Sequence, residues 1–457
     1  MSTAKWSDAP ALRGLAIAAA LVVGVGSMMR PAAAQGIPLI RDAEIERLLN
    51  DYAQPIFRAA GISRRRVAVR IVRSNIFNAF VIDDRNVYVH TGALMQSDTP
   101  NQLIGVIAHE AGHIAGGDVA ALKLRIQRDQ TKLLLLRILG IGAAIAARDA
   151  RAAAAGDDLV IRSLLAERRA QEGAADQRAI FYLNRTKQSG LGMLQTFERF
   201  QQQEYISDQH KDPFVRSHPV ATDRLALLRR RVHASPYFGS KDPPKLQLRH
   251  DMMRAKLAGY LESPAAVFNR YPQSDQTLPA RYARAIATFF RGGTNGVEAA
   301  VAAVTALVRE QPKYPYFYEL RADLLMRAGR ARQSIKDFRT AVKLDPDSTL
   351  IRVQLASALL ATGDKAAVLE AIKLATRAVR INEQNEDPQP RAYRVLGEAY
   401  YKNGQHARSY AATAEANFIA GRIKSAKIFA RRAIPGLRKE SPTWRRMDEI
   451  ITYKVER

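Results

Sequence analysis

The chain of 457 residues contains no cysteine. This absence excludes disulfide bonds, thiol nucleophiles and thiolate metal ligands, so any metal site must be built from histidine, aspartate and glutamate. Acidic residues are scarce beside basic ones, 44 against 70, and the formal net charge is +26. The Lys and Arg residues are spread over the whole chain without the interleaved aromatics of nucleic-acid modules. We therefore expect no nucleic-acid partner and interpret the charge as a diffuse basic surface that could assist peripheral contact with an anionic membrane.

Long apolar runs are few, and the first lies at residues 15–29. It follows Lys5 and Arg13 and is followed by the small residues of PAAAQ. A basic start, a short apolar stretch and an A-x-A site are typical of a secretory signal peptide. We therefore predict a signal peptide over residues 1–34, cleaved after Ala34. An uncleaved membrane anchor is the alternative, although the run is shorter than the roughly 20 residues of a membrane-spanning helix.

The second apolar run, at residues 133–147, is interrupted by Arg137 and continues into an Ala/Arg tract that ends near Asp158. It is too short and too charged to indicate a membrane span. We interpret this segment as a mobile helical flap over an active site. A hairpin that touches the membrane surface is the alternative.

The N-terminal half alternates helical and strand patterns. An amphipathic helix is expected to end near Gly61, and the alternating stretches RVAVRIV and NAFVIDDRNVYVHTG predict strands with a hairpin turn at residues 83–86. A helix follows at once. Thr99, Pro100 and Gln102 form its N-terminal capping signal, and a Gly-Gly pair at residues 116–117 ends it.

That helix carries the stretch VIAHEAGHIAGGD, residues 106–118. His109 and His113 are four residues apart and so share one helix face, where two imidazoles can hold one zinc ion. Glu110 stands beside them as the general base that takes a proton from water during attack on a peptide carbonyl. Two incidental histidines on a structural helix are the alternative interpretation.

A hydrolytic site of this kind needs a third ligand. AQEGAADQRA supplies Glu172 and Asp176, again four residues apart on a helix that is expected to resume at Leu159. We predict that Glu172 ligates the metal and that Asp176 hydrogen-bonds a ligand histidine, which fixes its ring. Gly173 between them weakens the helix by roughly 1 kcal/mol relative to Ala, and we expect it to allow close packing against the zinc helix.

The C-terminal half is repetitive. A linker with several prolines and glycines is expected at residues 236–276, and helical units follow at residues 277–457. Gly329 and Gly363 lie 34 residues apart, which is the period of tetratricopeptide (TPR) repeats. Residues typical of the repeat, which are mostly small, aromatic or leucine, recur at the matching positions: Ala322, Phe338, Ala341, Pro346, Leu355, Ala356, Leu396, Gly397, Tyr400, Gly404, Gly421, Ala426 and Ala433. An unrelated helical bundle is the alternative.

Together, HExxH on one helix and E-x-x-A-D on another resemble the gluzincin peptidases that include the CAAX prenyl endopeptidases and the bacterial HtpX proteins. NAFV, VYVHTGAL and the triplet SHP followed by Arg224 are similar to the same family. A TPR tail after an exported catalytic domain is most similar to the periplasmic beta-barrel assembly-enhancing group. The resemblance implies an α+β, mostly helical gluzincin domain at residues 35–235, followed by an all-α solenoid.

Residue roles also follow from the resemblance. It implies one Zn²⁺ per chain, held by His109, His113 and Glu172, with Glu110 as the base. It places His218 near the metal, either as a reversible inhibitory fourth ligand or as a stabiliser of the oxyanion, and it adds Arg224 to the surroundings of the site.

The strand after the hairpin turn has a possible role as well. An exposed edge strand could bind an extended substrate by main-chain hydrogen bonds, and the candidate substrate-binding residues are Asn78, Tyr88, Val89 and His90. A plain surface position is the alternative for His90. The expected function is periplasmic proteolysis of unfolded or misassembled envelope and outer-membrane proteins, with the TPR domain recruiting substrate or outer-membrane assembly machinery. The alternative is a non-catalytic chaperone or adaptor with a silenced peptidase domain.

Overall fold

The computed structural model describes residues 38–63, 67–121, 124, 151–201, 218, 221–293 and 295–454, with side chains of the helix that begins at residue 151 described from 166 onward, except 167 and 168. The predicted signal peptide, the apolar run at 133–147 and Pro219 lie outside these residues. Within the described part, no helix combines the length and the apolar character that crossing a membrane requires.

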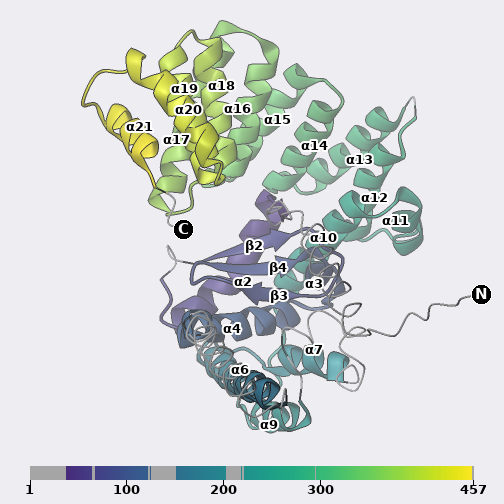
Figure 1. Ribbon diagram of the computed structural model, residues 1–457. Coiled ribbons are helices and arrows are strands. Elements are labelled where there is room, and N and C mark those ends of the chain that lie inside the picture. The colour runs from purple at the N-terminus through teal and green to yellow at the C-terminus, as the bar shows by residue number, and fades with distance from the viewer. Residues whose placement is uncertain are drawn as a thin grey trace, which may run out of the picture. The chain divides into compact units, whose positions relative to one another are not determined.

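A small sheet of four strands begins the described chain (Figure 1). Its strands are β1 (Leu39–Ile40), β2 (Ala68–Val72), β3 (Ala79–Val81) and β4 (Asn86–His90). The order is β1-β2-β4-β3, with β2 parallel to β4 and β3 antiparallel to it. The hairpin predicted at residues 83–86 is present, and its turn is closed by Asp83, whose Oδ1 accepts hydrogen bonds from the backbone N–H groups of Arg85 and Asn86.

The expectation that the strand NVYVH is an exposed edge is wrong. β4 is bonded on both sides, because Val87 is in register with Val69 of β2 and with Val81 of β3. The sequence shows that residues 78–90 form a hairpin, but not which of its two strands the more distant β2 joins. The edge strand on this side of the sheet is β3.

Among the described residues, six helices pack around the sheet in the N-terminal half. They are α2 (Ala43–Ala59), α3 (Thr91–Gln96), α4 (Pro100–Gly116), α6 (Arg151–Arg185), α7 (Leu191–Gln201) and α9 (Thr222–His233). Helix α4 begins and ends where the sequence predicts: the Thr99 side chain accepts from the N–H of Gln102, and Gly117 ends the helix at φ 68°. Gln102 itself accepts from the N–H of Asp98 rather than from that of Thr99. Helix α6 begins eight residues before the expected start at Leu159.

The segment expected to be a linker contains two helices, α10 (Pro244–Leu261) and α11 (Pro264–Arg270). Met253 and Leu257 of α10 belong to the core of the N-terminal half, while Met252 and Ala255 belong to the next core. The prolines of this segment suggested a linker, but Pro244 and Pro264 stand at the first positions of helices, where proline is tolerated. Helix α10 is therefore a packed element with apolar contacts on both sides.

Paired antiparallel helices follow to the end of the described chain (Figure 1). They are α12 (Leu278–Arg291), α13 (Gly296–Glu310), α14 (Pro315–Arg327), α15 (Ala331–Leu344), α16 (Thr349–Thr362), α17 (Lys365–Gln384), α18 (Pro390–Lys402), α19 (His406–Ile419), α20 (Ile423–Ala433) and α21 (Pro442–Thr452), with a 3₁₀ turn at Ile434–Gly436. Gly329 and Gly363 adopt φ values of 74° and 78° after α14 and α16. This left-handed backbone favours glycine and explains the period seen in the sequence. Phe338 and Ala341 are buried between the paired helices, as predicted.

One buried polar cluster joins helices from both halves. Lys256 of α10 is buried, and its Nζ lies 2.8 Å from Asp42 Oδ2, 3.2 Å from Glu44 Oε2 and 3.4 Å from Glu319 Oε2. Tyr282 also donates a hydrogen bond to Glu44. These ion pairs tie the start of α2 to α10 and α14, and three carboxylates there share a single buried ammonium group.

Candidate metal centre

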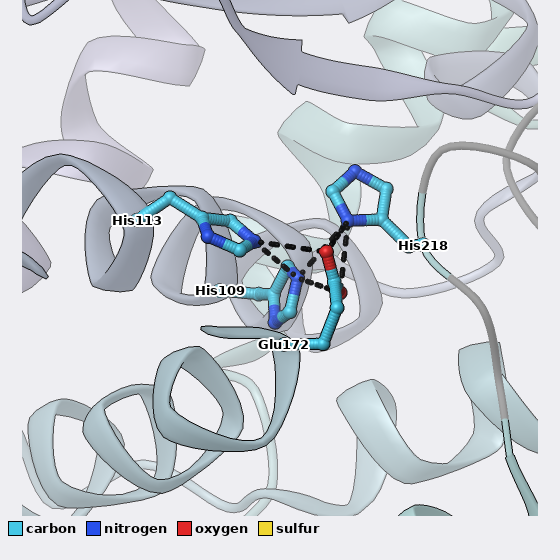
Figure 2. A group of neighbouring side chains, drawn as sticks. All are labelled: His109, His113, Glu172 and His218. Atoms are coloured by element: carbon cyan, nitrogen blue, oxygen red, sulfur yellow. Dashed lines mark hydrogen bonds and ion pairs between the residues drawn. The ribbon is translucent and has the colours of Figure 1, made fainter. Parts of the chain in front are cut away.

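Helix α4 presents two imidazoles from one face, as their spacing predicts. His109 and His113 are buried, and their Nε2 atoms lie 3.1 Å apart (Figure 2). The Nδ1 atom of each ring points away from this meeting point. His109 Nδ1 lies 2.9 Å from Asp176 Oδ1, and His113 Nδ1 lies 2.8 Å from Asp118 Oδ2. Both rings therefore direct the same atom, Nε2, toward a common centre.

Glu172 of α6 and His218 complete the group in Figure 2. Glu172 Oε2 lies 3.3 Å from His109 Nε2, and its Oε1 lies 3.5 Å from His113 Nε2. His218 Nδ1 lies 3.2 Å from both Glu172 oxygens and 3.3 Å from His109 Nε2. One donor atom from each of the four residues lies within 4.8 Å of all the others.

These separations fit a tetrahedral metal site. Four donors held about 2.0–2.1 Å from a zinc ion in tetrahedral geometry lie about 3.3 Å from one another. Five of the six donor pairs, counted with the nearer Glu172 oxygen, lie 3.1 to 3.5 Å apart and bracket that distance, and the His113–His218 pair lies within 4.8 Å. Three imidazole nitrogens and one carboxylate are a donor set that suits zinc. The chain thus brings together the predicted ligands His109, His113 and Glu172 with His218, which the family resemblance also placed near the metal.

Arg224 of α9 and Asp176 of α6 support the His109 side of the centre. Arg224 donates from Nε and Nη2 to the two oxygens of Asp176, at 2.5 and 2.8 Å, and its Nη1 lies 3.0 Å from Glu172 Oε2. Asp176 in turn faces His109. Asp176 and Arg224 thus contact the donor residues without contributing a donor atom to the metal group, as the sequence predicts.

Charge and burial compete at these groups. Burial by itself would lower the pKa of His109, but hydrogen bonds and charges from Asp176 and Glu172 raise it to about 9. Burial would raise the pKa of Glu172, yet His218 and His109 hold it well below its usual value. Likewise, burial opposes ionisation of Asp176, and the Arg224 guanidinium outweighs it and lowers the pKa. The carboxylates of Glu172 and Asp176 are therefore kept ionised.

Glu110 faces the same cluster from the next position on α4. Its side chain is fully buried at 0% exposure, and neither carboxylate oxygen has a hydrogen-bond partner among the described residues. Its Oε1 lies 3.3 Å from His218 Nε2. Burying a carboxylate without a hydrogen bond is costly, so its retention here indicates a chemical role.

Close packing of α4 on α6 sets the distance between the histidines and Glu172. A Cβ placed on Gly112 would lie 2.8 Å from Ala175 O and 3.0 Å from Ala175 Cα. The close approach therefore occurs at Gly112. The expectation that Gly173 provides it is wrong, because a Cβ on Gly173 would meet nothing within 4 Å; helix α6 turns this residue away from α4, toward a recess of about 250 Å³ that Arg224 also lines.

The four residues predicted to bind substrate, Asn78, Tyr88, Val89 and His90, lie in the sheet and do not form one exposed strand edge. Val89 is buried in the sheet interior, and the Tyr88 and Phe80 rings stack across β4 and β3 with centroids 5.2 Å apart. Asn78 is buried, and its carbonyl accepts from the N–H of His90. None of these four residues contributes a donor to the metal group. The main-chain contact between sheet and site comes from β3, where Ala79 O accepts from His218 Nε2 at 3.2 Å.

The ligand pattern in the sequence does not point to Asp118 or Arg178, which also lie at the site. Asp118 lies five residues after His113, outside the i, i+4 pattern used to find the ligands, and Arg178 is one of many arginines on α6. The only available signal was a carboxylate placed directly after a helix-ending Gly-Gly pair.

Comparison with known proteins agrees with this geometry. Residues 39–232 match peptidase family M48, whose members are metallopeptidases, and residues 291–348 and 319–386 match tetratricopeptide repeats. The beta-barrel assembly-enhancing protease of Escherichia coli (strain K12) is 23% identical over 404 residues, covering 85% of this chain and 78% of the relative. The Yersinia pestis protein of that name is 21% identical over 400 residues, with 85% and 79% covered. A putative one from Vibrio cholerae serotype O1 is 24% identical over 300 residues, with 63% and 60% covered. The chain thus combines a family M48 peptidase domain with tetratricopeptide repeats and is homologous to the beta-barrel assembly-enhancing proteases.

Proposed function

We propose that this protein is an exported, periplasmic zinc endopeptidase that cleaves unfolded or misassembled envelope proteins. The observation that carries the proposal is the arrangement of His109, His113 and Glu172 at tetrahedral donor spacings. Beside them lies the buried carboxylate of Glu110, which accepts no hydrogen bond from the described residues. A zinc site that served only structure has no use for such a carboxylate. When bound, zinc supplies Lewis acidity and lowers the pKa of coordinated water.

The chain's own residues supply the proton transfer. No described residue donates a hydrogen bond to either oxygen of Glu110, so it can accept a proton from a nucleophilic water and pass it to the leaving amine. Asp176 and Arg224 keep the His109 ring oriented, so that its Nε2 stays directed at the centre.

His218 fits the role of an inhibitory fourth ligand better than that of an oxyanion stabiliser. Its Nδ1 lies 3.2 Å from Glu172 Oε1 and 3.3 Å from His109 Nε2, which is the range of the distances between the other donor atoms. A residue there occupies the position that a catalytic zinc site leaves open for water. We infer that His218 must move away before the enzyme can turn over.

Substrate engagement would use the free edge of β3 rather than β4. Among the described residues β3 pairs with β4 alone, so its other main-chain edge faces no strand; Ala79 O on this strand accepts from His218 Nε2. Strand addition at this edge would recognise backbone rather than sequence. Such a mode suits unfolded chains. The printed name of the relatives points to beta-barrel assembly, and we propose that the TPR repeats recruit substrate or outer-membrane assembly machinery.

The decisive experiment replaces the base and retains the metal. Glu110→Gln should keep about one zinc per chain and lose casein cleavage by at least about a hundredfold, the scale of general-base catalysis. Glu398→Gln, on the exposed face of α18, is the matched control and should cleave like wild type. Equal cleavage by Glu110→Gln and wild type would refute the mechanism. Wild-type protein without zinc after chelator-free purification would instead favour the non-catalytic adaptor.

The regulatory role of His218 has a separate test. His218→Ala should raise basal casein cleavage, because it removes a donor from the fourth position while leaving the other three ligands in place. Zinc content measured on the same samples guards against metal loss. A fall in cleavage with zinc retained would assign His218 to the oxyanion instead.

A further inference from the structure

Asp118 makes the shortest polar contact of His113. Its Oδ2 lies 2.8 Å from His113 Nδ1, and both side chains are largely buried, at 12% and 8% exposure. This is the counterpart of the contact between Asp176 and His109 on the other ligand. Each ligand imidazole thus has a carboxylate on the ring nitrogen that faces away from the metal group.

The end of α4 makes this contact possible. In a continuous helix, residues five apart are rotated by roughly 140° about the axis and do not meet. Gly117 ends the helix in the left-handed region, and the next backbone turn begins with the Ala121 N–H donating to Gly117 O. The chain therefore turns back at this point, and Asp118 comes to lie beside His113.

Arg178 of α6 holds Asp118 in turn. Its Nη1 lies 3.6 Å from Asp118 Oδ2 and donates to the carbonyl of Gly112 at 3.2 Å. Gly116 leaves room for this guanidinium, because a Cβ there would lie 2.3 Å from Arg178 Nη1 and 2.7 Å from Asp118 Oδ1. Thus the glycine pair ends the helix at Gly117 and admits the arginine at Gly116.

We infer that Asp118, secured by Arg178, is a positioning residue that fixes the ring of His113 for metal binding. The arrangement repeats the relation of Arg224, Asp176 and His109, with an arginine from a neighbouring helix behind each carboxylate. Accepting the Nδ1 proton leaves the Nε2 lone pair of His113 directed at the centre and increases its basicity. This inference rests on the proposed zinc-dependent function and adds a residue whose role the ligand pattern does not contain.

The test compares three replacements in the full chain, read out by zinc affinity in competition with a chromophoric chelator and by the visible spectrum of the Co²⁺-substituted protein. Asp118→Ala should weaken zinc binding by about 10- to 100-fold, the usual effect of losing such a partner, and should alter the Co²⁺ bands. Asp118→Asn keeps an acceptor oxygen without the charge, so it should restore the wild-type Co²⁺ spectrum and part of the affinity. Asp347→Ala, at an exposed solenoid aspartate, is the control and should bind like wild type.

The outcomes separate this inference from the proposed function. Wild-type zinc affinity and an unchanged Co²⁺ spectrum in Asp118→Ala would overturn the inference alone. If Asp118→Ala does not fold, Asp118→Asn decides: zinc affinity below that of wild type with a wild-type Co²⁺ spectrum supports the inference, and zinc affinity equal to wild type overturns it. A wild-type chain that binds no zinc would overturn the proposed function, and this inference with it.

Discussion

Replacing Gly112 by Ala should push α6 away from α4 and loosen the metal centre. The new methyl group would lie 2.8 Å from the carbonyl oxygen of Ala175 and 3.0 Å from its Cα, and both are backbone atoms that cannot rotate away. Ordinary contacts with a Cβ begin near 3.4 Å. The backbone of α6 must therefore retreat by about 0.5 Å, a scale on which close-packed interiors respond with strain. Ala175 lies between Glu172 and Asp176, so both carboxylates would move with it.

The energetic cost can be bounded. Overpacking a close contact typically costs about 1–3 kcal/mol, while replacing a helical glycine by alanine contributes about 1 kcal/mol of stability. Gly173→Ala on α6 is the matched control, because it brings the same helix propensity and its Cβ meets nothing within 4 Å. The difference in the free energy of unfolding between the two variants then isolates the clash, at about 1–3 kcal/mol.

Two measurements on the same samples decide the matter. Denaturant unfolding should rank Gly173→Ala above wild type and Gly112→Ala below Gly173→Ala. Chelator competition should show zinc affinity unchanged in Gly173→Ala and reduced by about tenfold in Gly112→Ala, as for other losses of support behind a metal ligand. If the two variants unfold alike and bind zinc alike, the contact at Gly112 does not set the spacing of the ligands.

Two further predictions concern the buried polar cluster. Lys256→Met should destabilise the protein by about 3–5 kcal/mol in urea unfolding, because it leaves three carboxylates without their cation. Lys439→Met, at an exposed position, should change little, and equal losses would contradict the argument. Burial raises the pKa of Glu319 to about 7 from its usual 4.5, against the pull of Lys256. The raised value in the folded state means that the stabilising contribution of protonated Glu319 is complete below about pH 4.5 and is lost as the pH rises through 7. Glu319→Gln cannot ionise, so its melting temperature should fall less between pH 5 and pH 8 than that of wild type, and parallel curves would refute the assignment.

Some features could be predicted from the sequence because their causes are local. The spacing of His109 and His113 places them on one helix face regardless of the rest of the fold. Thr99 and the glycine pair mark the ends of that helix, and the recurrence of Gly329 and Gly363 sets the repeat period. Each of these signals needs only a few neighbouring residues and the geometry of one helix.

Other features were misjudged because they depend on partners far along the chain. Whether β4 or β3 is the edge depends on where β2 joins the sheet, and nothing within residues 78–90 records that. The prolines of 236–276 suggested a linker, yet α10 is held by apolar contacts with two separate cores. In both cases strand pairing and burial against distant residues determined the structure, rather than the conformational preferences of the local sequence.

The sequence by itself determined that the candidate metal ligands His109 and His113 share one helix face, with the proposed base Glu110 beside them, and it determined the repeat architecture, because helical periodicity fixes which side chains share a face. Only the tertiary structure brought Glu172 and His218 to tetrahedral spacing and folded Asp118 back onto His113. Those contacts join segments up to 109 residues apart, or depend on a helix ending at one glycine. The spacing of Glu172 from the two histidines follows from how α4 and α6 pack, and the absence of a side chain at Gly112 allows that close packing.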